Sequence, residues 1–104
     1  MDSKTLAALE GSIQKWVDIA AGRIADEGEN NCPLCKLFNN ADSKRACFGC
    51  PVEEKTGKPY CKKTPYRDWC NNEPVDCMAK TPGQKKKARA EVKFLRSLLP
   101  KSHL

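Results

Sequence analysis

Histidine and long apolar runs are nearly absent from this chain, and these absences exclude several classes of protein. The only histidine is His103, so a Cys–His nucleophile pair would have to use a residue next to the chain end. The H-x-E element of zinc deaminases does not occur. No apolar run approaches the roughly 20 residues that a membrane-spanning helix needs. We therefore expect a protein that is not an enzyme, that has no small-molecule substrate and that does not associate with a membrane.

Signals for secretion are also missing. Residues 1–8 contain no apolar signal segment, and no Asn-x-Ser/Thr glycosylation site occurs. We therefore expect a cytoplasmic protein, whose thiols stay reduced and available to metal ions. The 104 residues suffice for one domain spanning 1–104. Its hydrophobic share of 39% includes the cysteines, so the apolar core is thin. A cross-link that adds stability, either a bound metal ion or disulfides, is therefore expected.

Seven cysteines are the most distinctive feature of the composition. Cys32 and Cys35 form one C-x-x-C pair, and Cys47 and Cys50 form a second. Two such turns can supply the four thiolates of a closed, tetrahedral structural zinc site, which leaves no open position for catalysis. An iron–sulfur cluster takes the same ligands and is the alternative cofactor, and a disulfide framework is a further one.

The other three cysteines lack paired spacing. Cys61 follows a Gly-Lys-Pro-Tyr turn that could return it to the first site, where it could replace Cys47. Cys70 and Cys77 are expected to be small buried residues or exposed thiols. An alternative is a second metal site built from Cys61, Cys70, Cys77 and His103, which would require the end of the chain to fold back.

Helical periodicity predicts two long helices, over residues 4–26 and 82–99. In the first, one apolar stripe is opposed by a charged side that carries Lys4, Lys15 and Asp18. The stripe consists of Leu6, Leu9, Ile13, Trp16, Val17, Ala20 and Ile24. Asp2 or Ser3 can cap its start, and Gly28 with the following asparagines is expected to end it.

The second long helix has stronger boundary signals. Thr81 and Gln84 fit a capping box, with Pro82 at the first helical position. Pro100 is expected to stop the helix. Its apolar stripe consists of Ala88, Val92, Leu95 and Leu99, widened by Phe94 and Leu98.

Between the helices, residues 30–80 read as a cysteine-rich loop region with short hairpin pieces and one short helix over 65–70. The whole sequence therefore predicts a mainly α, small metal-stapled domain, in which the two long helices flank this region and pack their stripes together.

Positive charge is concentrated in the second half of the chain. Residues 1–54 hold 6 Lys+Arg against 9 Asp+Glu, whereas residues 55–104 hold 13 against 4. One side of the second helix and a preceding loop carry most of these cations: Lys85, Lys86, Arg89, Lys93 and Arg96, then Lys62, Lys63 and Arg67. Such a surface can neutralise phosphates of DNA or RNA, although it can also be a solvated face or meet an acidic protein.

Three aromatic residues lie near the basic loop. Tyr60, Tyr66 and Trp69 could stack on bases, or they could pack around the metal-binding turns.

Several runs of the sequence resemble one group of small cysteine-rich proteins of phages and prophages. These runs are Ser12-Ile13-x-Lys15-Trp16-x-Asp18-Ile19-Ala20, Asn31-Cys32-Pro33-Leu34-Cys35, Cys47-x-Gly49-Cys50-Pro51-Val52, Lys55-Thr56-Gly57, Thr64-Pro65-Tyr66-x-x-Trp69 and the stretch from Phe94 to Pro100. The resemblance implies that Cys32, Cys35, Cys47, Cys50 and Cys61 belong to a shared pattern. It also implies a phage-encoded protein in the host cytoplasm, and it carries no particular activity.

These observations predict a zinc-binding accessory protein that contacts nucleic acid through its basic C-terminal helix. The alternative is an interaction module that docks on a host protein and modulates it.

Overall fold

The structure is a computed structural model, and it describes residues 3–27, 31–38, 50–56, 65–66, 69 and 78–100. Four labelled helices lie in these ranges: α1 (Ser3–Ala20), α2 (Pro33–Phe38), α3 (Pro51–Thr56) and α5 (Pro82–Arg96). No strand occurs in the described part of the chain. The predicted mainly helical class is therefore confirmed.

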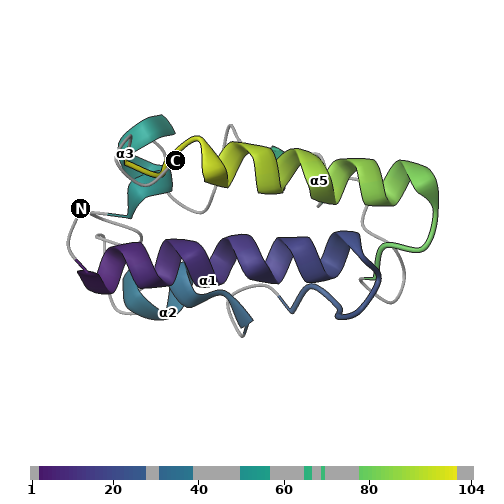
Figure 1. Cartoon of the computed structure of the whole chain (residues 1–104), viewed down its shortest axis with the longest axis horizontal. Helices are drawn as coiled ribbons and strands as arrows, with labels where there is room; N and C mark the ends of the chain where they lie inside the picture. The colour runs from purple at the N-terminus through teal and green to yellow at the C-terminus, as the bar shows by residue number, and fades with distance from the viewer. Residues whose placement is uncertain are drawn as a thin grey trace.

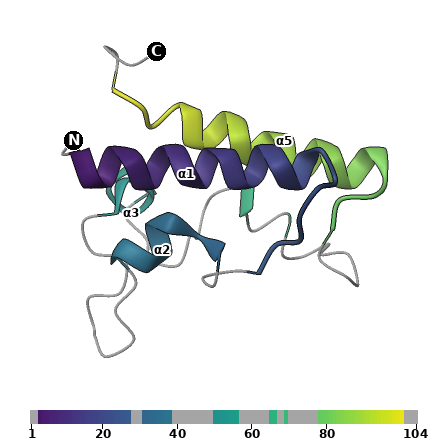
Figure 2. The same ribbon diagram turned by 60° about the horizontal axis from the view of Figure 1, so that its bottom comes forward.

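The two long helices lie side by side and run in opposite directions (Figure 1). Figure 2 shows α2 on another side of α1, so that α1 is covered by α5 on one side and by α2 on the other. Because two elements cover it, α1 must bury a wider strip of its surface than α5 does.

Helix α1 ends at Ala20, six residues earlier than the sequence predicts. Gly22 adopts a φ of +77°, which a residue with a side chain rarely takes. The Gly22 N–H bonds to the Ile19 carbonyl at 2.9 Å, and the Arg23 N–H bonds to the Asp18 carbonyl at 2.9 Å. This pair of bonds is the Schellman motif, which closes a helix with a left-handed glycine. The predicted ending at Gly28 is wrong because this earlier glycine ends the helix first.

Helix α5 begins with the predicted capping box. The Gln84 N–H bonds to Thr81 Oγ1 at 3.2 Å, and Gln84 Oε1 accepts the Thr81 N–H at 2.9 Å. The helix ends at Arg96, three residues before the predicted boundary. The next residues form tighter turns, in which the Leu99 N–H bonds to the Arg96 carbonyl at 3.1 Å. Proline at position 100 disfavours α-helical backbone at the residue before it, which accounts for this tightening.

The core lies between the apolar stripes of α1 and α5. Its members from the two helices are Ala8, Leu9, Ile13, Trp16, Ile19, Ala88, Val92 and Leu95. Leu34, Cys50, Val52, Trp69 and Ala79 from the intervening segments complete it. The predicted stripes are thus confirmed at their centres, whereas Leu6, Val17 and Leu99 lie half-buried at the edges.

Helix α2 fits closely against the middle of α1. A β-carbon on Gly11 would lie 3.0 Å from Pro33 Cγ, so only glycine permits this approach without a shift. Beside it, the buried Ser12 Oγ accepts the Leu34 N–H at 3.2 Å. That bond satisfies one of the N–H groups that the first turn of a helix leaves open.

The described residues of the predicted loop region are mostly helical. Helices α2 and α3 each begin with a proline directly after a cysteine, a position where proline suits a helix start. The short hairpin pieces that the sequence predicts do not occur among these residues. Pro65, Tyr66 and Trp69 have helical backbone, as expected for a helix over 65–70, and the remainder of that segment lies outside the described residues.

Candidate functional site

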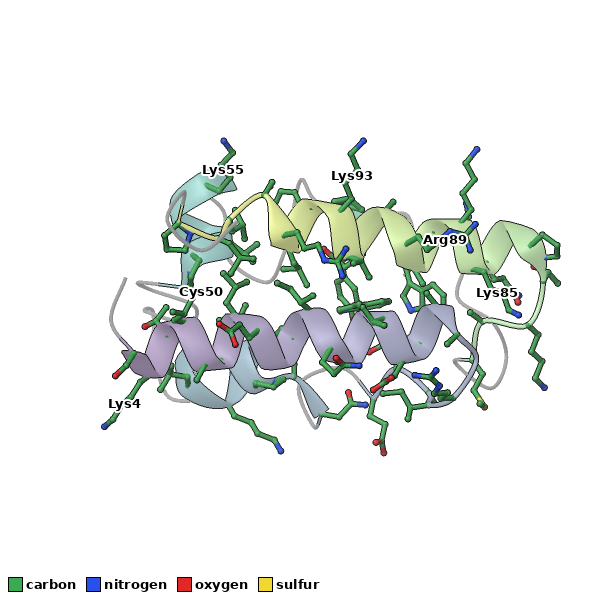
Figure 3. The ribbon with its side chains drawn as sticks, viewed as in Figure 1. Lys4, Cys50, Lys55, Lys85, Arg89 and Lys93 are labelled. Carbon is green, nitrogen blue, oxygen red and sulfur yellow. The ribbon has the colours of Figure 1, made fainter. Side chains whose placement is uncertain are left out.

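One side of α5 presents positive charge to the solvent. Lys86, Arg89, Lys93 and Arg96 are all exposed, and we call these four residues the basic face. Lys85 is half-buried at its margin. In Figure 3 the Lys93 side chain points away from α1. Four of the five cations that the sequence places on this helix are thus exposed, and their role in binding stays a prediction.

The one acidic residue of α5 is turned away from the solvent. Glu91 is only 4% exposed and lies in the strip that α5 buries. Burial raises the pKa of Glu91 from its usual 4.5 to about 8, the nearby Cys32 and Asp26 add to the rise, and Lys15 opposes it. The carboxyl group is thus mostly protonated near pH 7, and α5 exposes no negative charge.

The cations of the basic face are not neutralised within the described part of the chain. None of the four forms an ion pair there. Three of them surround a hollow of about 270 Å³, whose described lining is Arg89, Val92, Lys93 and Arg96. The face therefore combines open positive charge with a small concave site.

A buried ion pair links α1 to the segment that follows it. Lys15 Nζ lies 3.0 Å from Asp26 Oδ1, and the two side chains are 5% and 1% exposed. The Lys15 ammonium also lies 5.3 Å from the centre of the Trp16 ring. The prediction that Lys15 belongs to an outer charged side is wrong, because α1 buries a wider strip than one helix partner requires.

Trp69 belongs to the core rather than to a binding surface. It is 1% exposed, and its indole N–H bonds to Asp26 Oδ2 at 3.0 Å. Its ring meets Trp16 edge-on at 5.4 Å, and Tyr66 meets Trp16 in the same way at 5.5 Å. Packing, not base stacking, is thus the role of Trp69, and Tyr66 contributes to the same cluster. Tyr60 lies outside the described residues.

Two predicted metal ligands have described side chains. Cys32 is half-buried directly before α2, with its Sγ 3.9 Å from Ser12 Oγ. Cys50 is buried directly before α3, and Figure 3 shows it between that helix and α1. The backbone of Cys35 belongs to the first turn of α2. No cluster of three potential metal ligands occurs among the residues that the structure describes.

Many of the remaining predicted residues lie outside the described part of the chain. They are Cys47, Cys61, Cys70, Cys77, His103, Lys62, Lys63 and Arg67. The four-thiolate site, the possible second site and the basic loop therefore stay predictions.

The described architecture is a pair of antiparallel helices with a cationic outer face, a class of structure that many functions share. Comparisons with protein-family models, curated proteins and solved structures found no match. Within the described residues, no helix has both the length and the apolar character needed to cross a membrane.

Proposed function

We propose that this protein binds nucleic acid through the basic face of α5. The observation that carries the proposal is the burial of Glu91 beneath a face of four exposed cations. An exposed carboxylate on the same helix would partly cancel the attraction between these cations and a polyanion. Because Glu91 is buried, α5 has no such carboxylate.

The spacing of the cations suits a phosphate backbone. Lys86 and Arg96 are ten positions apart, which corresponds to about 15 Å along a helix axis. Duplex DNA carries one charge per roughly 3.4 Å along each strand, so a face of this length meets several phosphates at once. Binding by such contacts releases counterions and weakens steeply as salt rises.

The described surface favours nucleic acid over a protein partner. Among the described residues, Leu37 at 44% exposure is the only exposed large hydrophobic side chain. Protein interfaces draw most of their binding energy from a cluster of buried aromatic, arginine or aliphatic anchors. Arg89 and Arg96 are exposed, but no exposed aromatic side chain accompanies them among the described residues, whereas phosphate binding needs only the cations.

The test is fluorescence anisotropy with a labelled 20-base-pair duplex of DNA across 25–200 mM NaCl. The four cations predict a slope of log K against log [salt] of about −3 to −4. The variant K86Q/K93Q should lower affinity at 50 mM NaCl by roughly tenfold or more and reduce the slope by about 2.

A matched variant controls for net charge. K4Q/K36Q also removes two exposed lysines, but from α1 and α2, and should leave affinity within about twofold. Failure of the full chain to bind the duplex at 25 mM NaCl would overturn the proposal. Equal weakening by the two variants would also overturn it, since the α5 face would then have no special role.

The proposal includes a structural zinc ion held by Cys32, Cys35, Cys47 and Cys50, with Cys61 as the replacement for Cys47. The burial of Cys50 and half-burial of Cys32 support it, since a closed structural site shelters its thiolates from solvent. Zinc binding of this kind supplies folding free energy directly, which would compensate for the thin apolar core.

Native mass spectrometry with elemental analysis tests the metal. We expect one zinc per chain, its loss in C32S/C35S, and its retention in the control C70S/C77S. Removing the metal should lower both helicity and melting temperature. A metal-free chain, or one whose circular dichroism and melting are unchanged by a chelator, would overturn the zinc proposal. A brown, oxygen-sensitive sample would assign an iron–sulfur cluster instead.

A further inference from the structure

The hollow in the basic face differs from the rest of that face. Its described lining residues, Arg89, Val92, Lys93 and Arg96, stand at positions i, i+3, i+4 and i+7, so they share one side of α5. The volume of about 270 Å³ lies just below the range of roughly 300–1,000 Å³ typical of drug-sized ligands. A small anionic group fits this space better than a large cofactor.

The chemistry of the lining selects the kind of anion. Arg89 and Arg96 each offer a planar guanidinium with paired N–H donors, which match two oxygens of one phosphate. Lys93 adds a third positive charge between them. The described lining contains no carboxylate, because Glu91 of the same helix faces the core.

The described lining of the hollow includes one apolar residue. Val92 is 8% exposed and belongs to the core cluster, so it is a fixed part of the structure rather than a mobile surface side chain. An apolar wall beside three cations suits a phosphate that carries a carbon-rich neighbour, as every backbone phosphate does through its sugars. A free inorganic phosphate would gain nothing from that wall.

We propose that this hollow is the principal phosphate subsite of the basic face, holding one backbone phosphodiester between Arg89 and Arg96 with its sugar against Val92. This inference rests on the proposed function, and it states which residues contact the nucleic-acid backbone. Lys86, which does not line the hollow in the described structure, then contributes only general attraction.

Substitutions that conserve charge test whether binding depends on the shape of the arginine side chains or only on their positive charge. R89K/R96K keeps both positive charges but removes both guanidinium forks, and its duplex affinity at 50 mM NaCl should fall about fivefold or more with an unchanged salt slope. K86R keeps its charge outside the hollow and should bind as the unaltered protein does. Circular dichroism and melting curves of each variant verify folding, which these exposed positions should not disturb.

The outcomes distinguish this inference from the proposed function. If the unaltered protein and R89K/R96K bind the duplex equally well, the subsite is wrong while nucleic-acid binding stands. If the unaltered protein does not bind at 25 mM NaCl, the proposed function fails first. Displacement of the duplex by millimolar sodium phosphate at constant ionic strength would also overturn the assignment, because the hollow would then prefer a free phosphate to a backbone diester.

Discussion

The indole N–H of Trp69 bonds to Oδ2 of Asp26 at 3.0 Å, although the two residues stand 43 positions apart in the sequence. The other carboxylate oxygen of Asp26 pairs with Lys15 at 3.0 Å. One buried carboxylate therefore joins α1, the segment after it and the helical residue Trp69. This junction fixes Trp69, in the middle of the chain, to the first helix and the segment after it.

Removing the Trp69 donor should destabilise the protein. W69F keeps an aromatic ring but deprives the buried Asp26 of a hydrogen bond, and such bonds to charged groups are worth about 1.5–3 kcal/mol. Urea unfolding of W69F, D26A and the double variant measures their coupling. A coupling energy below about 0.5 kcal/mol would show that the bond contributes nothing specific to stability.

The buried and the exposed ion pair of this chain should differ sharply in how much the protein loses in stability when each is broken. K15M leaves the Asp26 charge buried without its cation, which typically costs about 3–5 kcal/mol. The matched change R23Q breaks the pair between Arg23 and Asp18, whose side chains are 68% and 25% exposed, and should cost less than about 1 kcal/mol. Chemical unfolding of both variants tests this contrast, and equal losses would contradict it.

Glu91 should make stability depend on pH. The folded chain holds the Glu91 proton with a pKa of about 8, against the usual 4.5. Its contribution to stability is therefore complete below about pH 4.5 and is lost as the pH rises through 8, with a slope of up to about 1.4 kcal/mol per pH unit between these values.

The variant E91Q isolates this effect. Glutamine resembles the protonated acid and does not titrate, so the difference in unfolding free energy between E91Q and the unaltered chain should grow from pH 5 to pH 8. Urea unfolding at each pH measures that difference. A difference that stays constant over this range would show that Glu91 has an ordinary pKa, and α5 would then carry a charged carboxylate.

The capping box of α5 should contribute measurably to stability. T81A removes the oxygen that accepts the Gln84 N–H and should cost about 0.5–2 kcal/mol. T81S keeps a hydroxyl and should recover most of that loss. Thermal unfolding followed by circular dichroism compares the two variants, and an equal effect of both would assign the cost to the lost methyl group instead.

The sequence was sufficient to predict those parts of the structure that residues close together in the chain determine. The capping box at Thr81 and Gln84, and the order of buried and exposed positions along α5, follow from helical spacing alone. The same spacing places Glu91 beside Ala88, Val92 and Leu95, so its burial could have been recognised from the sequence. The predicted end of α1 failed because two glycines competed and the first, Gly22, already had the bonds that close a helix.

Other features depend on contacts that periodicity does not encode. Helical spacing alone places Lys15 on an outer polar side, yet in the folded chain it pairs with the buried Asp26 and lies over the Trp16 ring. Helices α2 and α3 have six residues each, too few for a periodic pattern to stand out. The close approach of Pro33 to Gly11 likewise required knowledge of which helices meet.

The turn at Gly22 lies against the backbone of Ala79, since a β-carbon on Gly22 would be 3.4 Å from the Ala79 carbonyl oxygen. The chain therefore leaves the helix pair and returns to it at nearly the same place (Figure 1). Every contact between α1 and α5 consequently joins residues at least 62 positions apart, which raises the contact order of this helical protein. It should fold more slowly than a helical hairpin of equal size with a short loop. Lengthening this segment by a few flexible residues that leave Leu34, Val52 and Trp69 in place should change stability only slightly, because the entropy of closing a loop grows slowly with its length.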